Sequence, residues 1–303
     1  MYEVRTVTYK SDDDTITGQL FLPKDASDKV PCYVIIGPAS FVKEQSPMQY
    51  APRLAGQGFA ALIFDPRYFG ESGGQPRQFA DPASQVDDLK ASVTFLETIP
   101  EVDSSDIRML GVCMGSNWAT EAAASDSRVK QLTVIAGAYI SRKDMIARYY
   151  KDEADFEASL RTLEERLETY RKDGKVDYQP MVDPDIDRSF FTIPLPRAWY
   201  PSWDQHDVMP YKGLWENKIA TISEYGLWSF DVAGSFSRLT VPVLMINSEH
   251  SATPLAVTQE LFEMIPHDAK TAVNLGEQIQ TQFYDDPVTI DAVVDTMTAT
   301  PTS

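Results

Sequence analysis

The sequence contains few cysteines, few basic residues and no long apolar run, and each shortage excludes a class of protein. There are only two cysteines in 303 residues. Cys32 lies inside an apolar run and Cys113 in a glycine-flanked turn, so a structural disulfide is not expected, and two free thiols fit a reducing compartment. No segment reaches the roughly 18 consecutive apolar residues that a membrane span requires. The first fourteen residues are too polar for a signal peptide, which predicts a cytoplasmic protein.

The charge balance excludes partners that need a basic surface. Lys and Arg number 27 against 45 Asp and Glu, a net charge of −18. Nucleic acids and anionic membranes both require a positive patch, so neither is an expected partner. The expected partner is a small-molecule substrate that is neutral or meets a locally basic pocket. A homodimer is compatible with this composition.

What the sequence does contain is enough apolar material for one large core, at 43% hydrophobic residues. Two alternating runs split by SDDD predict an antiparallel hairpin at a sheet edge, over residues 4–10 and 15–22. Short runs that are apolar on both faces predict buried parallel strands, at 33–36, 60–64, 107–110, 131–136, 241–246 and 271–275. Segments with helical spacing lie between them, at 47–56, 83–96, 116–124, 258–264 and 288–297. The alternation predicts an α/β fold with a mostly parallel central sheet and helices on both faces.

Residues 143–235 interrupt this pattern without starting another. They begin with a charged, leucine-bearing helix at 151–172, and four of the five tryptophans fall between Trp199 and Trp228. We therefore predict a helical lid inserted into a core formed by 1–142 and 236–303. Aromatic side chains offer large contact area at little entropic cost, so the lid is expected to form one wall of an apolar pocket, with Trp203, His206 and Trp215 against the substrate.

The segment from Gly111 to Gly115, with Cys113 at its centre, carries the chemistry. A buried strand, then G-x-C-x-G, then a small-residue helix matches the nucleophile elbow of hydrolases, with cysteine in place of serine. Neighbouring positions in such a strained turn must be glycine to avoid clashes. The helix N-terminus is expected to lower the pKa of the thiol and make it a nucleophile. The alternative is that Cys113 is a small packing residue at a tight turn.

The oxyanion hole of such a turn uses the N–H that follows the nucleophile and a second N–H from the loop after the third strand, here the strand at 33–36. The first would be that of Met114. The second would come from Ala39 or Ser40, in the run GPASF, and the sequence leaves these two open.

Motifs spread over the chain outside the lid resemble the dienelactone-hydrolase-like α/β hydrolases, in the bacterial and fungal branch that includes fungal polyketide transferases. The matching stretches are VKEQ at 42–45, GQGF at 56–59, FD at 64–65, FGESGG at 69–74, GVC at 111–113, SDSRVK at 125–130, EH at 249–250 and FYD at 283–285. The resemblance implies the α/β-hydrolase fold, no cofactor or metal, and a carbonyl substrate attacked by the elbow residue. In the fungal relatives it implies work on polyketide intermediates.

Two departures from the family pattern bear on the mechanism. The family usually has HPGG where this chain has GPAS at 37–40. The triad histidine is expected a few residues before Leu-Tyr-Asp, and counting back from FYD puts Gln280 in its place. We predict that Gln280 stands near Cys113, where an amide can orient a substrate but cannot take up a proton near neutral pH.

Three histidines remain as candidates for a proton shuttle. His267 precedes the last strand, at the wrong end of the sheet, and is expected to be a surface residue. His250 follows a buried strand at the edge where such folds bind ligands, with Glu249 beside it. We predict His250 as the shuttle, the alternative being a loop histidine that orders its turn. Tyr68, at the end of another strand with Asp65 and Arg67, lines the pocket or serves structural hydrogen bonds. His206 in the lid reaches the pocket from above or lies in a hydrated loop.

Three functions fit this site. The first is hydrolysis or acyl transfer on an ester, lactone or thioester of a bulky apolar intermediate, with Cys113 as nucleophile. The second is a cyclase, isomerase or dehydratase that reuses the pocket without a triad, through Tyr68, Glu249 or His250. The third is a small-molecule receptor without chemistry.

Overall fold

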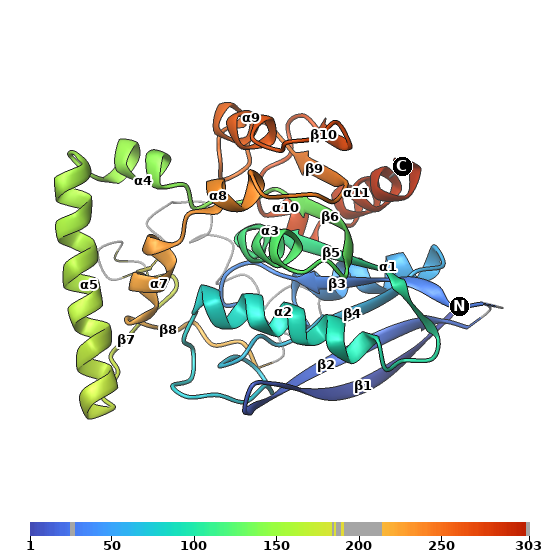
Figure 1. The fold of residues 1–303 in the computed structure, drawn as a ribbon, viewed down its shortest axis with the longest axis horizontal. Coiled ribbons are helices and arrows are strands. Elements are labelled where there is room, and N and C mark those ends of the chain that lie inside the picture. The colour runs from blue at the N-terminus through green and yellow to red at the C-terminus, as the bar shows by residue number, and fades with distance from the viewer. Residues whose placement is uncertain (25–27, 184, 186–188, 191–213, 301–303) are drawn as a thin grey trace.

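The computed structural model describes residues 1–24, 28–183, 185, 189–190 and 214–300 (Figure 1). Trp203 and His206, predicted to contact substrate, lie outside these residues. The elements of the core alternate between strands and helices, and the lid elements follow β6 and precede β9 in the chain.

An eight-stranded sheet runs through the molecule in the order β1-β2-β4-β3-β5-β6-β9-β10. Its strands are β1 (Tyr2–Ser11), β2 (Asp14–Pro23), β3 (Val30–Ile36), β4 (Ala60–Phe64), β5 (Val102–Val112), β6 (Val129–Ile135), β9 (Val243–Asn247) and β10 (Lys270–Asn274). The β1–β2 and β2–β4 pairs are antiparallel, and every other pair is parallel. The prediction of a mostly parallel sheet with an antiparallel hairpin at one edge is confirmed. Because the carboxyl ends of parallel strands share one edge of the sheet, the loops after β3, β4, β5, β6, β9 and β10 gather there.

Helices cover both faces of this sheet (Figure 1). They are α1 (Ser46–Gly56), α2 (Pro82–Leu96), α3 (Gly115–Ser125), α9 (Leu255–Glu263), α10 (Gln282–Asp285) and α11 (Pro287–Ala299). α1 packs against α10 and α11, whereas α2 packs against α3. The central strands β3 to β6 are sandwiched between these two groups, which explains why β4 reads as five consecutive buried apolar residues.

The elements between β6 and β9 lie together at one end of the molecule, at the left of Figure 1, apart from α8, which packs on α3. They are α4 (Arg142–Tyr149), α5 (Glu153–Asp173), β7 (Tyr178–Gln179), β8 (Ile219–Ala220), α7 (Ser223–Ser229) and α8 (Val232–Phe236). α5 buries a stripe that begins at Phe156 and continues through Leu160, Leu163 and Leu167. Its stripe recurs at helical spacing because one face alone meets the rest of the protein. The predicted lid boundaries, 143 and 235, remain a proposal.

Candidate active site

Cys113 stands in a strained turn between β5 and α3. Its backbone has φ of +58°, in the left-handed region that side chains other than glycine seldom adopt. The Cys113 N–H donates to the Ile135 carbonyl oxygen at 3.0 Å, so β6 holds the turn in place. Strain of this kind persists only where the surrounding structure enforces it, and it is frequent at functional sites.

The glycines on either side of Cys113 are required by close approach of the backbone. A Cβ added to Gly111 would lie 2.7 Å from the Gly115 carbonyl oxygen, and a Cβ on Gly115 would lie 2.4 Å from the Gly37 carbonyl oxygen. The second approach joins the start of α3 to the end of β3. The spacing G-x-C-x-G therefore follows from the crowding of two turns at one point of the sheet edge.

The Cys113 thiol is buried and hydrogen-bonded on three sides. Cys113 is 6% exposed. Burial raises the pKa of the thiol to about 11, against opposing hydrogen bonds from the Tyr284 hydroxyl, the Met114 N–H and the Gln280 amide. The expectation of a lowered pKa was wrong, because desolvation of the thiolate outweighs the donors around it. At neutral pH the resting form is the neutral thiol.

Gln280 lies beside Cys113, on the loop between β10 and α10, where the register of FYD placed it. Its Oε1 accepts the Ala252 N–H at 2.7 Å. Its Nε2 donates to the Ala136 carbonyl oxygen at 2.8 Å and to the Tyr284 hydroxyl at 2.9 Å. Gln280 is 5% exposed, so these bonds are shielded from water. One amide thus connects the ends of β6 and β9 to α10.

His250 and Glu249, predicted as the shuttle and its neighbour, point elsewhere. The His250 Nε2 lies 3.1 Å from Glu277 Oε2, and its side chain is 54% exposed. The Glu249 side chain is exposed as well, while its N–H donates to the Gly276 carbonyl oxygen at 2.8 Å. The turn after β9 is therefore hydrogen-bonded to the loop after β10, and the side chains of Glu249 and His250 face solvent. Among the described residues, neither appears with the groups that contact the Cys113 thiol.

The loop after β3 is the segment from which the second N–H of the oxyanion hole was predicted. Ala39 and Ser40 are each 3% exposed, and Ser40 has φ of +62°. Within the described part of the chain, neither backbone N–H donates a hydrogen bond. The Ser40 hydroxyl accepts a long hydrogen bond from Trp215 Nε1, at 3.4 Å. Trp215, a predicted substrate contact, thus reaches from the lid region to this loop.

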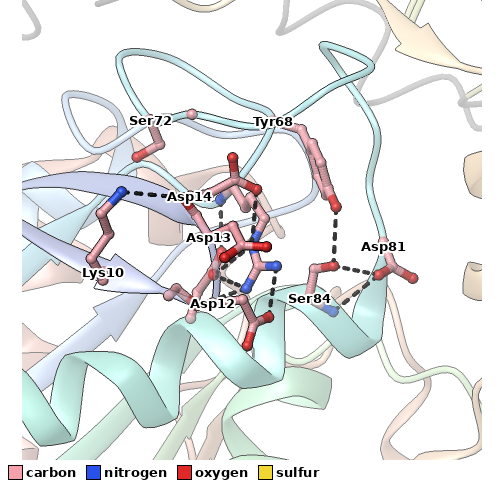
Figure 2. Close-up of polar contacts among 12 residues, drawn as sticks. Lys10, Asp12, Asp13, Asp14, Tyr68, Ser72, Asp81 and Ser84 are labelled. Atoms are coloured by element: carbon pink, nitrogen blue, oxygen red, sulfur yellow. Dashed lines mark hydrogen bonds and ion pairs between the residues drawn. The ribbon is translucent and has the colours of Figure 1, made fainter.

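Tyr68 is directed toward the start of α2. Figure 2 shows its ring running toward Ser84, whose hydroxyl lies 3.4 Å from the Tyr68 hydroxyl. Ser84 in turn donates to Asp81, the N-cap of α2. Burial raises the pKa of Tyr68, so its hydroxyl stays protonated. Of the two roles that the sequence left open for Tyr68, these contacts match the structural one.

Asp65 and Arg67 belong to buried ionic networks. Asp65 accepts from the Lys43 N–H at 2.8 Å and from Lys43 Nζ at 2.9 Å, and it is fully buried. Arg67 donates to Asp88 at 3.0 Å and to Asp12 at 2.9 Å, which ties the β1–β2 turn to α2. Both residues hold loops at the sheet edge in place.

A cavity of about 310 Å³ opens beside the elbow, between the core and the lid region. Met114, Ala252 and Thr253 line it from the core. Aromatic side chains line it from the other side, among them Tyr149, Phe190 and Trp228. This cavity has the size and lining of a site for a small apolar ligand. In the part of the chain that the structure describes, no group of His, Cys, Asp and Glu is arranged to hold a metal ion, and no helix is long and apolar enough to cross a membrane.

Sequence reasoning missed Tyr284 and Ala252. Tyr284 is in the matching FYD stretch and stands four residues after Gln280, so that one helical turn brings both side chains to Cys113. That spacing was the available signal. Ala252 contributes a backbone N–H, which carries no signal in a side-chain pattern.

Comparison with known proteins gives a consistent family. Residues 45–181 match the model of the serine aminopeptidase S33 family of hydrolases. An uncharacterized protein from Pseudomonas aeruginosa is 39% identical over 170 residues, 55% of this chain and 45% of that protein. Its crystal structure superimposes with a TM-score of 0.81 at 25% identity, over 98% of this chain and 93% of that one.

Two fungal relatives carry functional names. A thiohydrolase from Eupenicillium brefeldianum is 36% identical over 38% of this chain and 37% of its own length. A polyketide transferase from Penicillium crustosum is 35% identical over 43% of this chain and 42% of its own length. The matched region thus spans less than half of each of these relatives.

Proposed function

We propose that the chain is an α/β-hydrolase-fold enzyme of the acyl-transfer or hydrolytic type, in which Cys113 attacks the carbonyl carbon of a bulky apolar acyl thioester. The observation that carries the proposal is the elbow itself. Cys113 is held at φ of +58° with its thiol hydrogen-bonded to the Met114 N–H, at the start of α3. The names thiohydrolase and polyketide transferase among the relatives support a thioester of a natural-product intermediate.

Glutamine stands at position 280, where the family has its triad histidine. This favours a thioester over an oxygen ester as the substrate. In thiol exchange, Cys113 Sγ adds to the carbonyl carbon to give a tetrahedral oxyanion, and the bond to the leaving sulfur breaks when this intermediate collapses. The Cys113 proton ends on the departing thiol, so proton uptake and release balance without a base. An oxygen ester would release a far more basic alkoxide, which requires a proton donor in the transition state.

The oxyanion of the intermediate would be held by the Met114 N–H and an N–H of the Ala39–Ser40 loop. Gly115 packs against the Gly37 carbonyl, so the elbow and this loop move as one unit. The acyl chain would enter the 310 Å³ cavity, which Met114 lines. In this proposal Trp215 and Trp228 belong to the wall over the substrate, with Trp203 and His206 as further predicted contacts from the same region.

The test is covalent labelling by a synthetic thioester. The enzyme is incubated with the N-acetylcysteamine thioester of octanoic acid, and its intact mass is measured. We expect one octanoyl adduct on Cys113, the same adduct in Cys32→Ala, and none in Cys113→Ala. The p-nitrophenyl ester of the same acid should label more slowly relative to its intrinsic reactivity. An adduct of equal yield in Cys113→Ala would end the proposal.

A second function is favoured by the neutral resting thiol. Because burial raises the pKa of Cys113 to about 11, an enzyme that uses the pocket without a covalent intermediate would fit the same site. It would cyclise or isomerise a natural-product intermediate held by the oxyanion donors. In that case Cys113→Ala retains most of its rate on the substrate, and no adduct forms with the thioester.

A further inference from the structure

We propose that Tyr284 takes the place at Cys113 that a triad histidine would hold, as the hydrogen-bond donor to the sulfur, and that Gln280 is the positioning residue that aims its hydroxyl. The inference deepens the proposed function and rests on it, because it concerns the same thiol. It follows from counting donors and acceptors around Gln280.

The orientation of the Gln280 amide is fixed by two backbone groups of opposite kind. Its oxygen faces the Ala252 N–H, a donor, and its nitrogen faces the Ala136 carbonyl oxygen, an acceptor. Exchanging the amide oxygen and nitrogen would set donor against donor and acceptor against acceptor. The second hydrogen of Nε2 is directed at the Tyr284 oxygen, at 2.9 Å, with the Cys113 sulfur beside it.

The Tyr284 hydroxyl is the donor in its contact with Cys113. Its oxygen accepts from Gln280, and the same hydroxyl contacts the Cys113 sulfur. Because that contact lowers the pKa of the thiol, it favours the thiolate, which can only accept, so the tyrosine donates and the sulfur accepts. Tyr284 is 4% exposed, and its ring meets Phe41 edge-on, with centroids 5.6 Å apart. Phe41 thus fixes the Tyr284 ring, and Gln280 fixes its hydroxyl.

The three partners of the sulfur act on its charged form. Tyr284, the Met114 N–H and Gln280 each lower the pKa of Cys113 against the larger effect of burial. A histidine would instead accept the thiol proton and could later activate water. Tyr284 stabilises the thiolate, and none of the described groups that contact Cys113 is a base that deprotonates water at neutral pH. An acyl group on Cys113 is therefore held until an acceptor thiol, a stronger nucleophile than water, takes it over and its proton passes to the Cys113 sulfur.

The test is the pH profile of Cys113 alkylation by iodoacetamide, in a Cys32→Ala background that leaves one thiol. Tyr284→Phe removes the donor and retains the ring. We expect its alkylation midpoint to move to higher pH, with roughly tenfold slower alkylation at a fixed pH below the midpoint. Tyr9→Phe is the matched control: it removes a buried hydroxyl that bonds Ser92 at 2.6 Å, and it should leave the profile unchanged.

Gln280→Met keeps the inference testable if Tyr284→Phe does not fold. It leaves the Tyr284 hydroxyl in place but removes the amide that aims it, so the midpoint should move in the same direction by a smaller amount. A folded Tyr284→Phe with the wild-type profile overturns the inference, as does an unchanged Gln280→Met when Tyr284→Phe is unfolded. Alkylation involves no substrate, so a shifted profile without octanoyl labelling sinks the proposed function alone. Labelling with an unchanged profile sinks only the role of Tyr284.

Discussion

Two buried polar clusters lie at the same edge of the sheet and differ in charge. The Lys43 cluster consists of Lys43, Glu44, Asp65 and Glu71, and the Lys43 Nζ lies 2.7 Å, 2.9 Å and 2.6 Å from the three carboxylates in that order. The Cys113 cluster consists of Cys113, Gln280 and Tyr284 and holds no formal charge at neutral pH. Lys43, Asp65 and the three residues of the Cys113 cluster are withdrawn from water, whereas the Glu71 side chain is 52% exposed.

The charged Lys43 cluster has a structural role, whereas the neutral Cys113 cluster is suited to chemistry. Burial by itself would lower the pKa of Lys43, but Asp65, Glu44 and Glu71 together raise it, so the ammonium is fixed in its charged form. Asp65 also accepts the Glu71 N–H at 2.8 Å, and a Cβ on Gly70 would lie 2.2 Å from Asp65 Oδ2. The loop after β4 is thus closed around one carboxylate. In the Cys113 cluster, by contrast, small changes in hydrogen bonding alter the ionisation of one sulfur.

Lys43→Met should have the largest effect on stability. It leaves Asp65 as a fully buried carboxylate without its cation, which costs about 3–5 kcal/mol in comparable buried pairs. The measurement is urea unfolding followed by circular dichroism. The control is Lys143→Met, which removes a pair to Glu260 from a side chain that is 79% exposed. That change should cost less than about 0.5 kcal/mol. A similar loss of unfolding free energy in the two variants would show that the Lys43 cluster does not stabilise the fold.

Gly115→Ala should come second. Its Cβ would lie 2.4 Å from the Gly37 carbonyl oxygen, a backbone atom that can move only if β3 or α3 shifts, and overpacking of this kind costs about 1–3 kcal/mol. Gly56→Ala is the matched control. Nothing lies within 4 Å of its Cβ position at the end of α1, so alanine should be neutral or stabilise by about 0.5 kcal/mol. Thermal unfolding of both variants tests the pair, and equal melting temperatures would contradict the proposed crowding.

Cys113→Ala should have the smallest effect on stability and the largest on chemistry. It removes a small neutral group and retains the backbone conformation, so unfolding in urea should change by no more than about 1 kcal/mol. Octanoyl labelling and alkylation at this position should disappear. A stability loss comparable to that of Lys43→Met would mean that Cys113 is itself part of the scaffold, as the packing interpretation of the turn requires.

The elbow and the sheet were predictable because local sterics and patterning determine them. Crowding admits only glycine at 111 and 115, and the apolar runs at 60–64 and 107–110 can only be buried strands. Gln280 was located through the family resemblance, which implies the triad histidine a few residues before the Leu-Tyr-Asp that FYD matches here. None of these inferences required knowledge of distant contacts.

The rest depended on contacts that no local pattern encodes. His250 is turned to Glu277 because the loops after β9 and β10 pair along their backbones, and the strand order alone does not give that pairing. The donor role of Tyr284 depends on Ala252 and Ala136, two backbone groups far apart in sequence. The pKa of Cys113 was predicted in the wrong direction, because the helix terminus is visible in the sequence whereas the depth of burial is not.

The hydrogen bonds of Gln280 also bear on how such a site changes during evolution. Histidine and glutamine codons share their first two bases, so a single third-position mutation converts one residue into the other. A neutral histidine at 280 would meet the Ala252 N–H with one ring nitrogen and the Ala136 carbonyl with the other, and neither nitrogen would remain for Cys113. If a histidine at 280 kept both of these bonds, the one-base change would therefore not by itself supply Cys113 with a base.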